Sequence, residues 1–153
     1  SASMQKLIDD MIETMKEYDG VGLAADQVHE SLQLAVLEVA ENPRYPDKPK
    51  VPLTVLVNPR ITPLSEEMED DWEGCLSIPD LRGVVPRYKS VRVQAYDRHG
   101  QPLDFVALDF HARVIQHEFD HLQGILMIDH LGPLKKRMVD RKMKKRAEER
   151  AAP

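Results

Sequence analysis

The chain of 153 residues contains a single cysteine, Cys75, so no disulfide can form within it. A lone thiol suits a reducing compartment, where it can serve as a metal ligand or a nucleophile. No apolar run approaches the roughly 18 residues that cross a bilayer, and no secretory signal pattern opens the sequence. Internal repeats and low-complexity segments are absent as well. These absences predict a cytoplasmic protein that does not enter a membrane.

The composition is that of a globular protein. Hydrophobic residues make up 42% of the chain and charged residues 31%, and the mean hydropathy is -0.45. This balance is unlike that of a disordered or fibrous protein. The length suffices for one hydrophobic core, so we expect a single domain over residues 1–153.

Charge is distributed unevenly along the chain. Residues 135–150 hold nine basic side chains against three acidic ones, a net charge of +6, whereas the whole chain carries -5. The remainder is therefore an acidic body with a charge of -11. Such a basic segment fits an anionic partner, above all a nucleic acid, and it fits a solvated terminal helix equally well.

The hydrophobic pattern predicts an α+β fold. Residues 4–18 have the spacing of an amphipathic helix, and a second helix is expected over 110–122 and a basic one over 133–150. Short β-branched segments predict strands. We expect antiparallel sheets packed around the second helix, with strands over 32–39, 53–57, 91–96 and 103–108, the last two forming a hairpin.

The strongest chemical signal is the segment Gln116-His117-Glu118-Phe119-Asp120-His121 on the second predicted helix. Four residues advance a helix by slightly more than one turn, so His117 and His121 lie on one face and can reach one metal ion. In this HExxH pattern the glutamate takes a proton from the attacking water and passes it to the leaving group. The pattern is short, so packing histidines are the alternative.

A hydrolytic metal site usually has a third protein ligand. The position that holds a third histidine in metzincins is Met127 here, and the downstream glutamates Glu148 and Glu149 fall in the basic segment. Cys75 is the remaining strong donor, and a thiolate with two imidazoles fits a tetrahedral site with one open position. The alternative for Cys75 is a small buried apolar residue.

Three motifs together resemble the signatures of the peptide deformylase family, in the right order. They are Gly20-Val21-Gly22-Leu23-Ala24-Ala25-Asp26-Gln27, Glu73-Gly74-Cys75-Leu76-Ser77 and His117-Glu118-Phe119-Asp120-His121. The resemblance covers about residues 4–140, and the basic C-terminal segment is similar to that of bacterial type I enzymes. It implies removal of the N-formyl group from the N-terminal formylmethionine of nascent polypeptides, with release of formate.

The resemblance also implies roles for individual residues. Cys75, His117 and His121 would be the metal ligands, and Glu118 the general base and acid. The backbone N–H of Leu76 and the side chain of Gln27 would be the oxyanion donors, each contributing roughly 2.7–4 kcal/mol.

Substrate binding follows from the same resemblance. The substrate backbone would add as a strand beside Gly20 and Gly22. The methionine side chain would enter a pocket partly formed by Val21, Leu76, Val114 and the ring of His117. Glu73 would pair with Arg87 and steady the cysteine loop, and Arg82 would meet the peptide further along. For Val21 and Val114 ordinary core packing is the alternative, and for the arginines an exposed surface position.

The sequence departs from the family pattern in three places. Asp26 precedes Gln27 where the family usually has a small residue or proline, and His29 replaces a frequent glycine. The family's first strand is expected to be absent, because the chain begins at its first helix. We expect the chemistry to survive this and stability to fall, since a lost strand exposes a sheet edge.

The resemblance implies Fe(II) as the metal in the cell, with nickel, cobalt or zinc in purified protein. The expected partners are the formylmethionyl peptide and, through residues 135–150, ribosomal RNA; the protein is expected to be a monomer. Two other functions remain open from the residues. One is an HExxH metallopeptidase that cuts internal peptide bonds, and the other is an inactive deformylase-like protein that binds the ribosome.

Overall fold

The computed structural model describes residues 2–18, 20–28, 30, 32–40, 47–75 and 78–124; for Val28, Cys75 and residues 78–82 it describes the backbone. This part of the chain forms two α-helices, α1 (Ala2–Glu17) and α2 (Asp109–Leu122), and a short 3-10 helix, η1 (Ala25–Val28). It also forms strands β1 (Gly22–Ala24), β2 (Leu34–Val39), β3 (Val51–Pro63), β4 (Met68–Cys75), β5 (Ile78–Tyr88), β6 (Ser90–Tyr96) and β7 (Pro102–Leu108).

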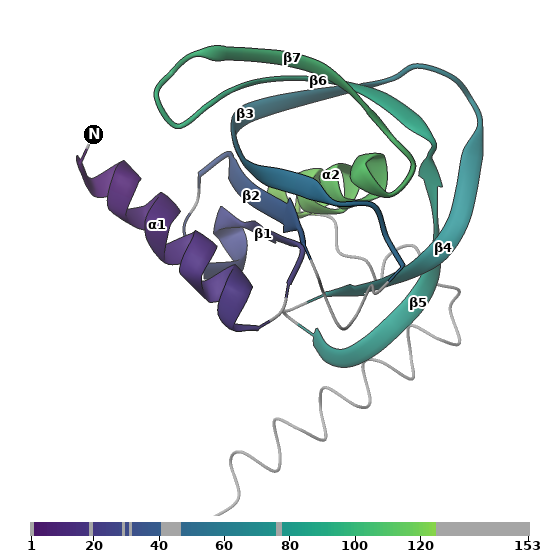
Figure 1. Cartoon of the computed structure of the whole chain (residues 1–153), viewed down its shortest axis with the longest axis horizontal. Helices are drawn as coiled ribbons and strands as arrows, with labels where there is room; N and C mark the ends of the chain where they lie inside the picture. The colour runs from purple at the N-terminus through teal and green to yellow at the C-terminus, as the bar shows by residue number, and fades with distance from the viewer. Residues whose placement is uncertain are drawn as a thin grey trace, which may run out of the picture.

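Two antiparallel sheets surround α2. Five strands form one sheet in the order β1-β2-β3-β6-β7, and β4 pairs with β5 in a separate hairpin. The long strand β3 pairs with β2 through its first half and with β6 through its second half. Its register shifts between Val57 and Arg60, where Asn58 has a φ of 52°. In Figure 1 the larger sheet curves over α2, and the β4–β5 hairpin lies along another side of this helix.

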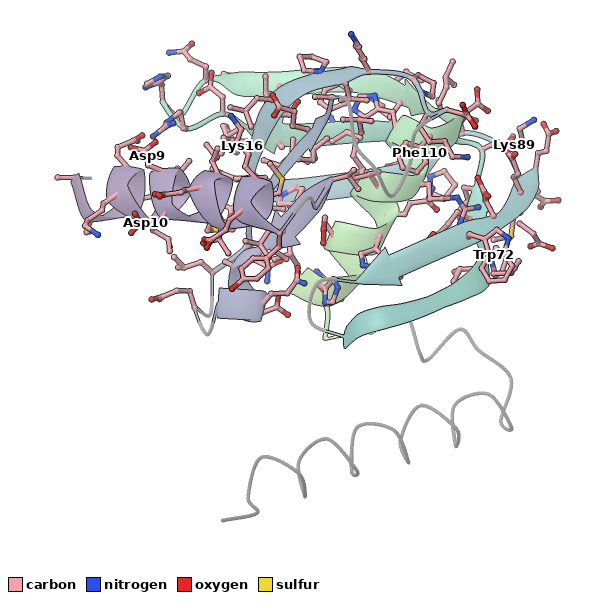
Figure 2. The ribbon with its side chains drawn as sticks, turned by 60° about the horizontal axis from the view of Figure 1, so that its bottom comes forward. Asp9, Asp10, Lys16, Trp72, Lys89 and Phe110 are labelled. Carbon is pink, nitrogen blue, oxygen red and sulfur yellow. The ribbon has the colours of Figure 1, made fainter. Side chains whose placement is uncertain are left out.

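The helices bury their apolar faces against the larger sheet. Ile8, Met11 and Met15 recur every three or four residues on α1 and are at most 1% exposed, as an amphipathic helix requires. They pack on residues of β1 and β2. The apolar face of α2 packs in a second cluster against β2, β3, β6 and β7, and its members are Phe110, Ala112, Val114 and Ile115. Figure 2 shows α1 on one flank of the molecule, with Trp72 of β4 on the opposite flank.

The predicted α+β class with a central HExxH helix is confirmed. The helices predicted over 4–18 and 110–122 are present as α1 and α2, and the predicted strands and the hairpin of β6 and β7 are present as well. Three strands were not predicted, namely β1, β4 and β5. The acidic residues of β4 and the prolines of β5, residues depleted in strands, explain why propensity does not reveal that hairpin.

The predicted basic helix over 133–150 lies outside the described residues. Among the helices that are described, none is long and apolar enough to cross a membrane.

Candidate active site

The two histidines of α2 face each other one helical turn apart. The Nε2 atoms of His117 and His121 are 3.2 Å apart, and the ring centroids are 4.9 Å apart. His121 is 2% exposed, and the side chain of His117 is 11% exposed. Together with Glu118 they offer ligand atoms that all lie within 4.8 Å of one another. The helical spacing therefore produces the predicted cluster.

Glu118 is a buried carboxylate, 3% exposed. Its carboxylate lies close to Gly22 of β1. A β-carbon built on Gly22 would lie 2.5 Å from Oε2 of Glu118, well inside van der Waals contact. The absence of a side chain at position 22 is therefore what allows β1 and the Glu118 carboxylate to approach.

Glu73 of β4 orients His117. The carboxylate accepts a hydrogen bond from Nδ1 of His117 at 2.8 Å and two from Arg87 of β5, each at 2.9 Å. Burial alone would raise the pKa of Glu73, but the hydrogen bonds from His117 and Arg87 and the charge of Arg87 outweigh it and lower the pKa to about 2. An ionised Glu73 only accepts hydrogen bonds, so Nδ1 of His117 carries a proton, and in the neutral form of the ring Nε2 has the lone pair that a metal ligand needs.

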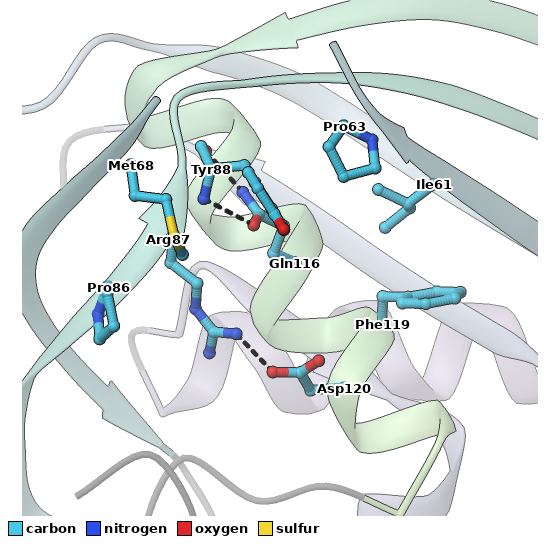
Figure 3. A pocket seen from close by; sticks show the side chains of 9 residues that line it. All are labelled: Ile61, Pro63, Met68, Pro86, Arg87, Tyr88, Gln116, Phe119 and Asp120. Carbon is cyan, nitrogen blue, oxygen red and sulfur yellow. Dashed lines mark hydrogen bonds and ion pairs between the residues drawn. The ribbon is translucent and has the colours of Figure 1, made fainter. Parts of the chain in front are cut away.

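A second ion pair joins the β4–β5 hairpin to α2. The guanidinium of Arg87 also pairs with Asp120, as Figure 3 shows. Beside this pair, Gln116 donates to the carbonyl of Tyr88 at 2.8 Å and accepts from its N–H at 3.0 Å. These residues line one side of a cavity of about 290 Å³ between α2, β3 and β5.

Gln27 lies in η1, directly after β1. Its Oε1 accepts a hydrogen bond from the backbone N–H of Ala24 at 2.8 Å. This bond identifies the oxygen end of the amide, so the opposite end carries the two N–H donors. The neighbouring Asp26 is exposed.

The other predicted site residues that are described lie directly before β1 and in β4, β5 and α2. The N–H of Gly20 donates to the carbonyl of Met15 at 2.9 Å, and the carbonyl of Val21 accepts from Glu38 at 3.0 Å. Val114 is 4% exposed, within the core cluster of α2. Cys75 ends β4, two residues after Glu73, and Arg82 lies in β5 opposite Gly74; their side chains lie outside the description, as does Leu76 entirely.

Sequence reasoning missed two buried polar residues of α2. Arg113 is 4% exposed and Gln116 is 8% exposed, and both bond to the β4–β5 hairpin. Their positions at four residues and one residue before His117 were visible in the sequence. Their partners were not, because the hairpin itself was not predicted.

The donor set fits a divalent metal ion. Two nitrogens at about 2.0–2.1 Å from a tetrahedral ion lie about 3.3–3.4 Å from each other, close to the 3.2 Å between the two Nε2 atoms. The carboxylate–histidine contact is typical of metal-ligating histidines, because it fixes the ring and its tautomer.

Comparison with known proteins agrees with this geometry. The polypeptide deformylase family matches residues 1–137. Peptide deformylase 2 of Ralstonia nicotianae is 59% identical over 120 residues, which are 78% of this chain and 68% of that protein. The class I type b enzyme of Acinetobacter baumannii, solved with Met-Ala-Ser bound, superimposes with a TM-score of 0.82 at 44% identity and covers 86% of this chain and 82% of that chain. The peptide deformylase of Legionella pneumophila superimposes with a TM-score of 0.84 at 39% identity, and the match covers 100% of this chain and 86% of that chain.

The geometry of the site and the comparisons lead to one conclusion. The geometry consists of the HExxH cluster on α2 and the glutamate that orients its first histidine. The comparisons are the match along residues 1–137 and the identity to bacterial relatives. This chain belongs to the peptide deformylase family and is a metal-dependent hydrolase that acts on N-formylmethionyl peptides.

Proposed function

We propose that His117 and His121, together with the thiolate of Cys75, hold one divalent metal ion in the deformylase site. The 3.2 Å between the two Nε2 atoms supports this assignment. It is supported further by Glu73, which keeps the proton of His117 on Nδ1. Cys75 follows Glu73 by two residues on the same strand, so the ligand-bearing strand and the orienting carboxylate belong to one element.

Glu118 is the general base and general acid. Bound in this site, a divalent ion supplies Lewis acidity that makes water a nucleophile near neutral pH. Glu118 takes the proton from the attacking water and delivers it to the leaving amine. The side chain is buried, and the absence of a β-carbon at Gly22 leaves its carboxylate the place that it occupies.

The oxyanion that forms on the formyl group is stabilised by the Gln27 amide and the backbone N–H of Leu76. Gln27 is suited to this role because its Oε1 already accepts from Ala24, which orients the amide. Donors preset in this way need no reorganisation during the reaction.

The peptide substrate lies along β1. This strand ends the five-stranded order. Its backbone at Gly22 and the preceding carbonyl of Gly20 provide main-chain partners for an added strand, whereas the N–H of Gly20 bonds to Met15. The methionine side chain enters a pocket to which Val21, Leu76, Val114 and the ring of His117 contribute; Glu73 supports the cysteine segment and Arg82 meets the peptide further along. The Met-Ala-Ser complex of the Acinetobacter baumannii enzyme is consistent with this substrate class.

The metal in the cell is Fe(II), and nickel, cobalt or zinc replaces it in purified protein. A thiolate with two imidazoles accepts all of these ions, so affinity alone does not select one of them. The enzyme is a cytoplasmic monomer with one catalytic domain over residues 1–153.

The basic segment over 133–150 contacts ribosomal RNA and brings the enzyme to nascent chains. The +6 charge of residues 135–150 supports this partner. Deletion of residues 135–150 should abolish co-sedimentation with ribosomes, and salt should weaken the contact steeply in the intact chain. Undiminished co-sedimentation of the truncated chain would contradict it.

The observation that carries the catalytic assignment is the clustering of His117, Glu118 and His121 on α2. The test is hydrolysis of formyl-Met-Ala-Ser by protein loaded with Ni(II), or with Fe(II) under anaerobic conditions, beside acetyl-Met-Ala-Ser and the Glu118→Gln variant. We expect turnover of the formyl peptide alone and a fall of about 10²–10⁴-fold in kcat for the variant. Wild-type turnover by a metal-loaded Glu118→Gln variant would contradict the role of Glu118.

A further inference from the structure

Arg113 crosses from α2 to both strands of the β4–β5 hairpin. Its side chain is 5% exposed. Nη1 donates to Oε2 of Glu73 at 2.6 Å and to the carbonyl of Val85 at 2.7 Å. Nη2 donates to the carbonyl of Glu69 at 2.5 Å. One guanidinium therefore holds a side chain of β4 and the backbones of β4 and β5 against the helix that carries the histidines.

The hydrogen bond from Arg113 is the fourth that the carboxylate of Glu73 accepts. Oε1 accepts from His117 and from Nη2 of Arg87, and Oε2 accepts from Nε of Arg87 and from Arg113. A carboxylate offers about four lone-pair sites. All four are used, so neither oxygen can turn toward another donor without losing a bond, and the oxygen that faces Nδ1 of His117 is fixed.

Arg113 and Asp120 attach the same hairpin at two separate points of α2. Seven residues make about two helical turns, so the two positions lie on one face of α2, about 10.5 Å apart along the helix axis. Arg113 bonds to Glu73, and Asp120 bonds to Arg87. His117 lies between these two points in the sequence. Gln116 and His117 also bond to the hairpin between these two points, so among these four residues Arg113 provides the attachment nearest the N-terminus of α2.

The charges in this cluster balance. Glu73 and Asp120 carry two negative charges, and Arg87 and Arg113 carry two positive ones. Removal of Arg113 leaves an excess negative charge in a buried place, which is costly. It also leaves the carbonyl of Val85, which faces the helix, without this donor.

We propose that Arg113 is a positioning residue of the deformylase reaction: it holds β4 in register with α2, so that Glu73 keeps His117 oriented and the metal ligands of the two elements stay at a fixed separation. This inference rests on the metal site proposed above. It requires no contact between Arg113 and the substrate. Loss of Arg113 should therefore act on metal affinity and kcat, and leave KM for the formyl peptide almost unchanged.

The test compares Arg113→Met and Arg113→Lys with Arg92→Met in the full chain. Arg92 pairs with Asp104 on the exposed face of the β6–β7 hairpin, so it controls for the loss of an arginine outside the cluster. Affinity for Co(II) is measured by competition with a chelator, and the absorption spectrum of the Co(II) protein is recorded. We expect Arg113→Met to bind Co(II) about 10–100-fold more weakly with an altered spectrum, and Arg92→Met to match the wild type.

Arg113→Lys separates positioning from charge balance. It keeps the positive charge but lacks the planar fork that reaches several acceptors in fixed directions. We expect it to fold and to bind Co(II) several-fold more weakly than the wild type. Wild-type Co(II) affinity and spectrum in folded Arg113→Met would overturn the proposal. If Arg113→Met does not fold, the same result for Arg113→Lys would overturn it.

Failure of the metal site itself has a different signature. The wild-type Co(II) protein should show thiolate charge-transfer absorption that disappears in Cys75→Ala. Its absence from the wild type would overturn both proposals. Its presence in the wild type, with no effect of the Arg113 substitutions on affinity or spectrum, would overturn the role of Arg113 alone.

Discussion

The carboxylate of Glu118 occupies the place that a side chain at Gly22 would take: a β-carbon at position 22 would lie 2.5 Å from Oε2 and 2.8 Å from Cγ. Because such a short separation is not tolerated, the buried side chain of Glu118 would have to shift. Gly22→Ala should therefore displace the carboxylate and lower kcat by about 10–100-fold, since small misplacements at a reacting centre are costly. Steady-state hydrolysis of formyl-Met-Ala-Ser measures this.

Gly100→Ala is the matched control for that substitution. Gly100 has a φ of 79°, where an alanine is strained, but no atom lies within 4 Å of its added β-carbon. We expect this variant to lose about 1 kcal/mol of stability and to keep its kcat. A Gly22→Ala variant with the kcat of the wild type would show that the contact with Glu118 does not constrain catalysis.

Gln27 should act through its N–H donors and not through its oxygen. Gln27→Glu keeps an acceptor for the N–H of Ala24 but cannot donate to an oxyanion. We expect kcat to fall about 10²–10³-fold and the melting temperature to stay close to that of the wild type. Gln27→Ala, which removes donor and acceptor together, should lose kcat to a similar extent and stability in addition. A Gln27→Glu variant with the wild-type kcat would contradict the oxyanion role.

Metal binding should stabilise the fold, because the proposed ligands come from both α2 and β4. At a free concentration 100 times its Kd, Ni(II) should raise the free energy of unfolding by about 2.7 kcal/mol. Thermal denaturation with Ni(II) and with a chelator measures this shift. His121→Ala and Cys75→Ala should lose most of it, whereas Glu118→Gln should retain it, because Glu118 is not a proposed ligand. Equal shifts in all three variants would contradict the ligand assignment.

The Lys48–Asp71 pair should contribute a pH-dependent part of stability. Burial would raise the pKa of Asp71, but the hydrogen bond and charge of Lys48, aided by the N–H of Trp72, lower it below the ordinary 3.8. A lowered folded-state pKa stabilises the protein above the unfolded value and is lost as the pH falls through the folded one. Asp71→Asn should therefore cost about 1 kcal/mol at pH 7 and much less at about pH 3, as measured by urea unfolding.

Lys48→Met is the companion variant for that prediction. Lys48 also lies over the ring of Phe110, 5.2 Å from its centroid, and this cation–π contact does not depend on the charge of Asp71. Lys48→Met should therefore remain destabilised at about pH 3, where Asp71→Asn approaches the wild type. The same pH dependence in both variants would contradict the separation of the two contacts.

The helices could be predicted from the sequence because each carries its own periodic signal. The spacing of Ile8, Met11 and Met15 describes a face that is buried in the structure, and the spacing of His117 and His121 alone brings their rings together. The β6–β7 hairpin could be predicted from its alternation and from the turn ending at Gly100. In these cases the local period decides the structure.

The elements that tie the site together could not be predicted in this way. β4 includes Asp70, Asp71 and Glu73, and β5 includes Pro79 and Pro86, so propensity argues against both strands. Their mutual pairing and their contact with α2 compensate for this. The burial of Arg113 depends on that contact, and its sequence position alone is that of any polar residue on a helix.

The hairpin of β4 and β5 is an excursion between two strands that are neighbours in the larger sheet, β3 and β6. β3 and β6 pair directly with each other, so the strand pairing of the larger sheet does not pass through the hairpin. One contiguous segment, residues 68–88, contains Cys75 and brings Glu73 and Arg87 to α2. The hairpin is therefore a structural unit separate from the larger sheet. An exchange of this segment between related enzymes would replace the proposed third ligand and the groups that orient His117 together. The strand pairing of the larger sheet would stay the same.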